Sequence, residues 1–198
     1  MVAGFRLYPA YFDAAAQSRL ATAVLEAARG APFYRPVTPT GKAMSVEMTN
    51  LGPLGWVTDA AGYRYEARHP LTGEAWPPIP GALLAMWVDL APEAPPPDAC
   101  LVNLYRPGAR MGLHQDRDEA DFAHPVMSVS LGDTALFRIG GTERRAPARS
   151  LRLDSGDVCI LAGPARLAFH GIDRIVPDSS RVVPDGGRIN LTLRRARL

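Results

Sequence analysis

The 198-residue chain has little cysteine, almost no lysine and no long apolar run. Its 2 cysteines, Cys100 and Cys159, lie in apolar, strand-like segments without a partner at metal-ligand spacing, which argues against a disulfide framework or a zinc site. The longest apolar run, residues 82–88, is far too short to cross a bilayer, and no signal-peptide core follows the N-terminus. We therefore expect a protein of the cytoplasm that is not bound to membranes. No amphipathic stripe demands an oligomer, so we also expect a monomer.

Basic residues are distributed unevenly along the chain, although the net charge is only +2. Residues 1–137 carry 10 basic and 14 acidic side chains, whereas residues 138–198 carry 12 and 6. All basic residues except Lys42 are arginine, whose planar fork fits carboxylates and phosphates with two hydrogen bonds. A basic C-terminal third suits a polyanionic partner, but an arginine-rich solvated surface explains the charge at least as well.

The first half of the chain mixes helical and β-like patterns. Hydrophobic periodicity predicts two helices, at residues 13–29 and 80–90. Residues 31–80 between them hold many glycines, prolines and aromatic residues. The turn sequence Asp-Ala-Ala-Gly at residues 59–62 has a β-like segment on each side, so it predicts a β-hairpin.

After the proline-rich connector at residues 92–98 the hydrophobic period changes to two, which is typical of strands. Eight short strands are predicted, separated by glycine, proline and aspartate, at residues 100–105, 112–115, 126–131, 135–139, 150–153, 157–161, 167–170 and 189–194. Consecutive short strands without intervening helices indicate an all-β barrel or a double-sheet jelly roll.

Two histidines and a carboxylate in this β region form a candidate metal site. His114 and Asp116 are two residues apart, so in an extended segment their side chains point to the same side, with Cα atoms about 7 Å apart. His170 ends a later predicted strand. Two histidines and one carboxylate make the facial triad of non-haem Fe(II) oxygenases. Taken alone, a His-x-Asp pair occurs by chance in many chains, and a strand-end histidine is more often a hydrogen-bonded core residue.

The predicted last strand carries charge on one face. Apolar residues alternate there with Arg188, Asn190, Thr192 and Arg194, which share the other face. An arginine buried without a partner is costly, so a bound anion is the natural partner if this face points inward. Asn103 also shares a face with Tyr105 on another predicted strand. A dicarboxylate such as 2-oxoglutarate satisfies all these groups, whereas an edge strand with its polar side in water needs no ligand.

Together these motifs resemble the AlkB family of 2-oxoglutarate- and Fe(II)-dependent dioxygenases. The matching motifs are NLYRPG at 103–108, LHQDRDE at 113–119, VSLG at 129–132, SGDV at 155–158, HGI at 170–172 and RINLTLR at 188–194. The resemblance implies a mainly β fold, a double-stranded β-helix (jelly roll) with N-terminal helices and a small β-hairpin lid. Residues 1–98 then hold the helices and the nucleotide-recognition lid (about 31–80), and residues 99–198 hold the dioxygenase core, all in one compact unit.

The resemblance also implies roles for individual residues. The Fe(II) ligands correspond to His114, Asp116 and His170. The 2-oxoglutarate-binding groups correspond to Asn103, Tyr105, Arg188, Asn190 and Arg194. Of these, Arg188 with Tyr105 is expected to hold the distal carboxylate, and Arg194 is expected to lie toward the carboxylate at the metal. The substrate-binding residues correspond to Trp56, Tyr63, Tyr65, Asp118 and Arg144.

The implied activity is oxidative demethylation of N1-methyladenine and N3-methylcytosine in DNA, or in RNA, by direct reversal. Its cofactors are Fe(II), 2-oxoglutarate and O2, and its products include formaldehyde, succinate and CO2. Aromatic lid residues suit this activity because they stack on an unpaired base and attract a cationic one. Two alternatives stay open: a 2-oxoglutarate dioxygenase acting on a protein or a small molecule, and a non-catalytic nucleic-acid-binding or cupin-like metal protein.

Overall fold

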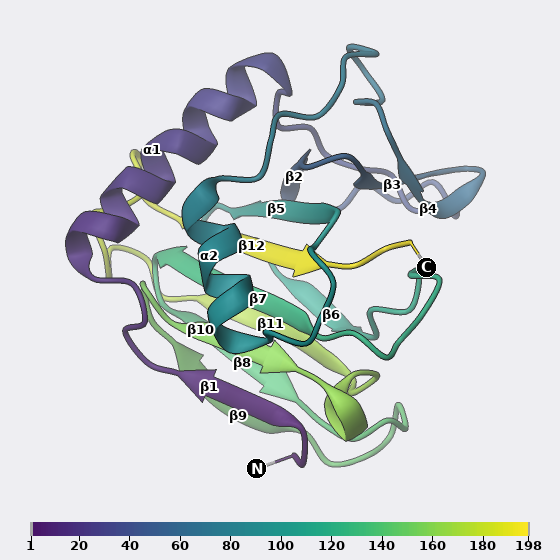
Figure 1. The fold of residues 1–198 in the computed structure, drawn as a ribbon, viewed down its shortest axis with the longest axis vertical. Coiled ribbons are helices and arrows are strands. Elements are labelled where there is room, and N and C mark those ends of the chain that lie inside the picture. Colours follow the sequence, from purple (N-terminus) through teal and green to yellow (C-terminus); the bar gives the residue numbers. More distant parts are fainter. Residues whose placement is uncertain (1, 198) are drawn as a thin grey trace.

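The computed structural model describes residues 2–197, whose strands form two packed antiparallel sheets and a separate hairpin (Figure 1). The larger sheet has the strand order β1 (Phe5–Tyr8), β10 (Val158–Leu161), β7 (Val126–Gly132), β12 (Arg188–Arg194), β5 (Ala99–Tyr105) and β2 (Glu47–Leu51). The smaller sheet has the order β6 (Met111–His114), β11 (His170–Ile175), β8 (Ala135–Ile139) and β9 (Arg149–Leu153). This double-sheet arrangement confirms the predicted jelly roll.

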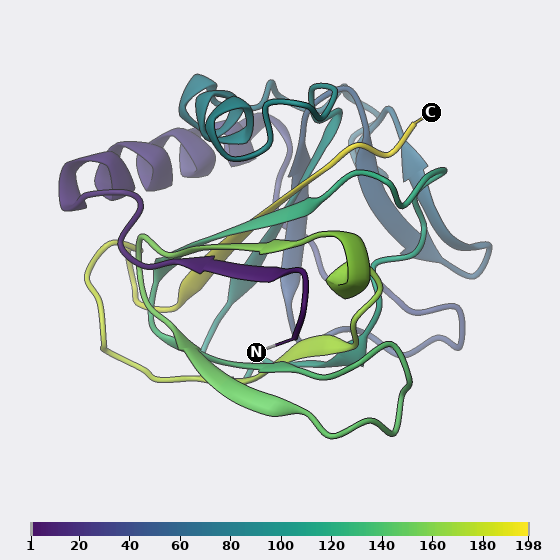
Figure 2. The same cartoon turned by 60° about the horizontal axis from the view of Figure 1, so that its bottom comes forward.

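Both helices cover the outer face of the larger sheet, as Figures 1 and 2 show from two directions. They are α1 (Ala14–Gly30) and α2 (Gly81–Leu90). Asp13 caps α1, since its carboxylate accepts a hydrogen bond from the Ala16 amide at 2.7 Å. One buried cluster joins apolar residues of both helices to the sheet, among them Leu20, Val24, Leu83, Trp87, Val129 and Leu191. Neither these helices nor any other within residues 2–197 combines the length and apolarity needed to cross a membrane.

Strand β12 lies in the middle of the larger sheet, between β5 and β7. Its apolar residues pack under the helices, and all are fully buried: Ile189, Leu191 and Leu193. Its polar residues line the space between the two sheets: Arg188, Asn190, Thr192 and Arg194. The predicted alternation is therefore confirmed, and the alternative of a solvent-facing edge strand is wrong because both neighbouring positions are occupied by strands.

The predicted hairpin is formed by β3 (Gly55–Asp59) and β4 (Gly62–Glu66), and it projects from the jelly roll (Figure 1). Asn50, in β2, holds the start of the hairpin with two hydrogen bonds of 3.0 Å to the backbone of Trp56. Gly62 has a φ of +110° at the turn, a conformation that other residues rarely adopt. The hairpin is thus attached firmly to the larger sheet at its base.

Two features of the β region differ from prediction. β1 is a strand that the sequence did not predict, and β2 from the first half of the chain joins the same sheet, so residues 1–98 and 99–198 share one sheet. His170 begins strand β11 rather than ending a strand at 167–170. The predicted strand is displaced because a short 3-10 helix, η1 (Gly163–Ala165), leads into a turn in which the Ala168 amide bonds to the carbonyl of Ala165.

Candidate active site

A cavity of about 460 Å³ lies between the two sheets and opens beside the hairpin. Three kinds of side chain line it: the two histidines with Asp116, polar groups of β5 and β12, and aromatic residues of the hairpin. Apolar residues of both sheets complete the wall, including Leu101, Phe137, Leu153 and Ile172. A mostly apolar pocket with a few converging polar groups is the usual form of a ligand site.

The predicted metal ligands converge in this cavity. His114 ends β6 and His170 begins β11, and the two residues stand directly opposite each other in the pairing of these strands. Their ring centroids are 4.6 Å apart. The Nε2 atoms of His114 and His170 lie 3.6 and 3.8 Å from the carboxylate oxygens of Asp116. One ligand atom from each residue lies within 4.8 Å of the others, a spacing that a single ion can bridge.

The backbone determines which imidazole nitrogen faces the metal. Nδ1 of His114 lies 2.9 Å from the carbonyl oxygen of Gly112, and Nδ1 of His170 lies 2.9 Å from that of Ala168. Since a carbonyl oxygen only accepts hydrogen bonds, Nδ1 carries the proton in both rings. Each Nε2 therefore presents its lone pair toward Asp116, the arrangement that a metal-binding histidine requires.

Burial and nearby charges keep these groups in the protonation states that bind a cation. Burial lowers the pKa of His170 to about 4, so the imidazole is neutral at neutral pH. Burial also raises the pKa of Asp116, but Arg194 and the two imidazoles outweigh this effect and hold the pKa below its ordinary range. An ionised carboxylate beside two imidazole nitrogens is the donor set of a non-haem Fe(II) site.

Arg188 forms the second polar region of the cavity, on the face of β12 that also carries Asn190. Its side chain is buried at 1% exposure, and its Nη2 donates to Ser130 Oγ at 3.0 Å. Its Nε and Nη1 have no hydrogen-bond partner within the described part of the chain. The guanidinium lies 5.4 Å from the ring centroid of Tyr105. Unsatisfied buried donors of a cation fit a carboxylate, so this wall matches one end of 2-oxoglutarate.

Asn190, Asn103 and Arg194 surround the same cavity with different partners. The Asn190 side-chain amide donates to Ser128 Oγ at 2.5 Å and to the Val129 carbonyl at 3.1 Å. Arg194 forms an ion pair with Asp116, with Nη2 2.8 Å from Oδ2. The structure therefore brings all predicted 2-oxoglutarate residues together, with Arg194 at the metal end and Arg188 at the opposite end.

Comparison with known proteins supports this geometry. The family model described as the 2OG-Fe(II) oxygenase superfamily matches residues 4–194. Over 197 residues the chain is 64% identical to a Caulobacter vibrioides protein named "Alpha-ketoglutarate-dependent dioxygenase AlkB homolog", covering 100% of this chain and 90% of that protein. The chain belongs to the AlkB family of 2OG-Fe(II) oxygenases.

Other members of the AlkB family are similar to this chain over most of its length. The Escherichia coli protein named "Alpha-ketoglutarate-dependent dioxygenase AlkB" is 42% identical over 189 residues, 93% of this chain and 86% of that protein. The solved structure of OsALKBH1 superposes with a TM-score of 0.85 at 32% identity, covering 97% of this chain and 96% of that chain. This AlkB-family chain is thus a dioxygenase that requires Fe(II), 2-oxoglutarate and O2.

Trp56, Tyr63 and Asp118 meet at the mouth of the AlkB-family cavity. The rings of Trp56 and Tyr63 are stacked, with centroids 5.5 Å apart and an interplanar angle of 17°. Trp56 Nε1 donates to Asp118 Oδ2 at 2.7 Å. Tyr63 is 49% exposed, so its ring offers a free face to a ligand. These three predicted substrate residues therefore form one surface above the metal ligands.

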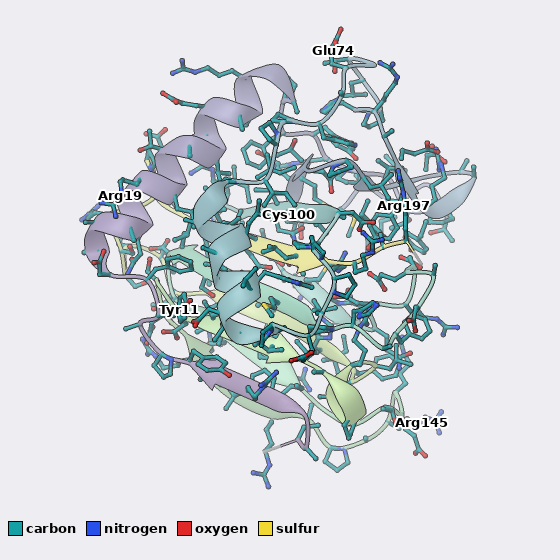
Figure 3. The ribbon with its side chains drawn as sticks, in the orientation of Figure 1. Tyr11, Arg19, Glu74, Cys100, Arg145 and Arg197 are labelled. Atoms are coloured by element: carbon teal, nitrogen blue, oxygen red, sulfur yellow. The ribbon has the colours of Figure 1, made fainter. Side chains whose placement is uncertain are left out.

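The other two predicted substrate residues lie outside the cavity lining. The Tyr65 hydroxyl donates to Glu119 Oε1 at 2.6 Å, so this side chain points toward the protein. Arg144 is exposed in the loop between β8 and β9, with its guanidinium 5.8 Å from the ring centroid of Phe169. Figure 3 labels its neighbour Arg145 at the outer edge of this loop. Their substrate-binding roles stay predictions.

Two buried residues beside the site were absent from the sequence-based candidates, Glu119 and Arg166. Glu119 falls inside the LHQDRDE motif, where it looks like a member of an exposed acidic cluster. Arg166 precedes His170 by four residues in a segment predicted partly as strand. Buried charges are rarely unpaired, so a buried acidic residue implies a buried basic partner. The sequence does not show which residues are buried, so this rule pairs Glu119 with Arg166 only once the fold is known.

Proposed function

We propose that this dioxygenase removes alkyl groups from nucleic-acid bases, with N1-methyladenine and N3-methylcytosine in DNA as its first substrates and RNA as a further one. The observation that carries the proposal is the stacked pair of Trp56 and Tyr63 at the mouth of the cavity. Aromatic faces stack on any unpaired base, and this pair lies on the hairpin above His114, Asp116 and His170.

The proposed substrates suit such a site physically. A base must leave the helix before an enzyme can oxidise one of its atoms, and a methyl group on the pairing edge has already removed the pairing energy. Both methylated bases are cationic, so an aromatic face attracts them. Asp118 adds a negative charge at the same mouth, and its carboxylate is well placed to accept from an exocyclic amine.

The chain's own residues supply positioning and exclusion of water. His114, Asp116 and His170 would hold Fe(II), and Arg188 with Tyr105 and Asn190 would hold 2-oxoglutarate. When bound, Fe(II) and 2-oxoglutarate supply the oxidation: O2 is consumed, 2-oxoglutarate becomes succinate and CO2, and one oxygen atom enters a methyl C–H bond. The hydroxymethyl group then leaves as formaldehyde, and a proton is released from the cationic base.

The wider setting is also part of the proposal. Both cysteines are free thiols in the buried core, which fits a reducing compartment such as the cytoplasm. The basic excess after residue 137 fits a nucleic-acid partner. We propose that the protein acts as a monomer on single- or double-stranded DNA.

A lesion panel tests the proposal directly. Oligonucleotides of one sequence, carrying either methylated base, are incubated as single- and double-stranded DNA and as RNA with the protein, Fe(II), 2-oxoglutarate and ascorbate. We expect mass loss of the methyl group with equimolar succinate and formaldehyde. Folded protein that turns over no methylated oligonucleotide contradicts the proposal, and succinate formation with peptides or small molecules instead favours the alternative substrate classes.

Variants of Trp56 test the carrying observation. Trp56→Ala removes the stacking ring, so it should abolish repair while 2-oxoglutarate is still converted slowly without substrate. Trp56→Phe is the matched control: it keeps a ring but loses the hydrogen bond to Asp118, and it should retain most of the repair activity. Unchanged repair by Trp56→Ala argues against base stacking at this mouth.

A further inference from the structure

Glu119 is a buried carboxylate that neither the metal nor the 2-oxoglutarate assignment uses. Its side chain is only 1% exposed and lies in the loop between β6 and β7, three residues after Asp116. Three groups surround it: Arg166 Nη2 at 3.0 Å from Oε2, Arg194 Nε at 3.4 Å from Oε1, and the Tyr65 hydroxyl at 2.6 Å from Oε1. A buried charge is costly without such partners, so this arrangement demands a physical reason.

Arg166 holds Glu119 and the metal-ligand segment at the same time. Arg166 is only 3% exposed, and each nitrogen of its guanidinium has an acceptor. Nη1 donates to the backbone carbonyl of Asp116 at 2.7 Å, Nε donates to that of His124 at 2.9 Å, and Nη2 donates to Glu119. The planar fork therefore fastens the loop at three points, including the residue that carries the metal carboxylate.

Arg194 connects Glu119 to the metal ligand Asp116. Its guanidinium contacts both carboxylates, Asp116 at 2.8 Å and Glu119 at 3.4 Å. With Glu119 present, the positive charge of Arg194 is shared between two acidic groups. Without it, Asp116 alone would neutralise Arg194, and the same carboxylate must also bind the metal.

Tyr65 connects Glu119 to the hairpin. Besides donating to Glu119, the Tyr65 hydroxyl accepts from Arg194 Nη1 at 3.3 Å. Tyr65 is the direct cross-strand partner of Trp56 in the β3–β4 pairing. A constraint on Tyr65 is therefore a constraint on the stacking ring above the metal ligands.

We propose that Glu119 is a positioning residue that sets both the Asp116 carboxylate, through Arg166 and Arg194, and the hairpin, through Tyr65. Its charge keeps Asp116 available to the metal, and its hydrogen bond keeps the hairpin seated over the cavity. This inference depends on the metal assignment but not on the nature of the substrate, so it can fail or succeed independently of the proposed nucleic-acid function.

The test uses two readouts that involve no substrate turnover. The first is the Kd for Co(II), a spectroscopic substitute for Fe(II), titrated without 2-oxoglutarate. The second is amide hydrogen exchange of the hairpin, residues 55–66, compared with exchange of strands β5, β7 and β12. Glu119→Gln keeps the shape but removes the charge, so we expect a Co(II) Kd about 10-fold higher, the usual effect of losing a group behind a metal ligand. A neutral acceptor binds the Tyr65 hydroxyl more weakly than a carboxylate does, so we also expect faster exchange confined to residues 55–66.

Three further variants separate the two connections. Tyr65→Phe removes the hydrogen bonds of the hairpin to Glu119 and Arg194 but leaves the contacts of Glu119 with Arg166 and of Arg194 with Asp116. Exchange of residues 55–66 should therefore accelerate while the Co(II) Kd stays unchanged. Arg166→Lys keeps the charge but cannot reach three acceptors, so the Co(II) Kd should rise. Glu26→Gln, on the exposed side of α1, is the matched control and should change neither readout.

The outcomes decide between positioning and a purely structural role. An unchanged or lower Co(II) Kd in Glu119→Gln overturns the proposal. So does an increase in exchange that is uniform over the sheets, because that reports general loosening. If Glu119→Gln does not fold, the other two variants decide: unchanged hairpin exchange in Tyr65→Phe, or unchanged Co(II) affinity in Arg166→Lys, overturns it.

Discussion

Arg188 and Arg194 stand at opposite ends of β12, on the same face, and are 1% and 6% exposed. Burial acts to lower the pKa of both guanidinium groups. For Arg188 this effect prevails, and the pKa lies below its ordinary value. For Arg194 the neighbouring Asp116, Tyr65 and Glu119 outweigh burial and raise the pKa well above the ordinary value. One end of the strand is therefore neutralised by the protein itself, and the other retains a charge for a ligand.

This difference divides the cavity into two functional ends. At the Arg194 end, the protein supplies carboxylates and imidazoles, which suit a cation. At the Arg188 end, the protein supplies a cation whose Nε and Nη1 have no acceptor among residues 2–197, which suits an anion. A ligand with a metal-binding end and a distal carboxylate spans the two, as 2-oxoglutarate does.

The largest expected effect comes from breaking the neutralised end. Arg194→Met leaves Asp116 and Glu119 buried without their shared cation, so we expect a loss of about 3–5 kcal/mol in the free energy of unfolding. Urea denaturation of the metal-free protein measures it. A loss below about 1 kcal/mol, as for an exposed ion pair, would mean that solvent reaches these carboxylates.

Removing the charge at the Arg188 end should affect ligand binding more than stability. Arg188→Met removes a charge that has no carboxylate partner within residues 2–197, so the metal-free protein should be as stable as wild type or more stable. Binding of 2-oxoglutarate should weaken by about 2–3 kcal/mol, the strength of hydrogen bonds to a charged group. Titration of the metal-loaded protein with 2-oxoglutarate, followed by absorption, checks this, and unchanged affinity would assign the distal carboxylate to another residue.

The sequence alone predicted this strand well but not the difference between its ends. Alternation placed both arginines on one face, and local spacing joined His114 to Asp116, because both rules depend on the strand's own geometry. Glu119, one of the two carboxylate partners of Arg194, lies in a loop 75 positions earlier. Arg166 lies at the turn that displaces the predicted strand. The edge strand β1 was missed since four residues give too little periodicity to recognise.

A milder change sharpens the comparison at the Arg188 end. Ser130→Ala removes the hydroxyl that accepts from Arg188 Nη2 at 3.0 Å and leaves the guanidinium in place. The loss of one such hydrogen bond costs about 1 kcal/mol, so we expect the KM for 2-oxoglutarate to rise several-fold while kcat changes little. Ser18→Ala is the matched control, since the Ser18 hydroxyl donates to the backbone carbonyl of Ala14 on the exposed side of α1. A lower kcat with constant KM would show that Ser130 acts on the reacting atoms instead.

At neutral pH the smallest effect is that of the two thiols, each near one of these arginines. Burial raises the pKa of Cys100 to about 12, although Arg194 lowers it, and raises that of Cys159 to about 11, although Arg188 lowers it. Cys100, labelled in Figure 3, belongs to the buried cluster between the larger sheet and α2. Because the native pKa exceeds the unfolded value, the protonated thiols favour folding fully below about pH 8.5, and this contribution is lost as the pH rises toward about 11. The slope is at most about 1.4 kcal/mol per pH unit for each thiol.

Unfolding of wild type and of Cys159→Ala between pH 8 and 10 measures this slope. The variant should lose less stability over this range than wild type. Equal slopes would mean that the Cys159 thiol is already solvated in the native protein.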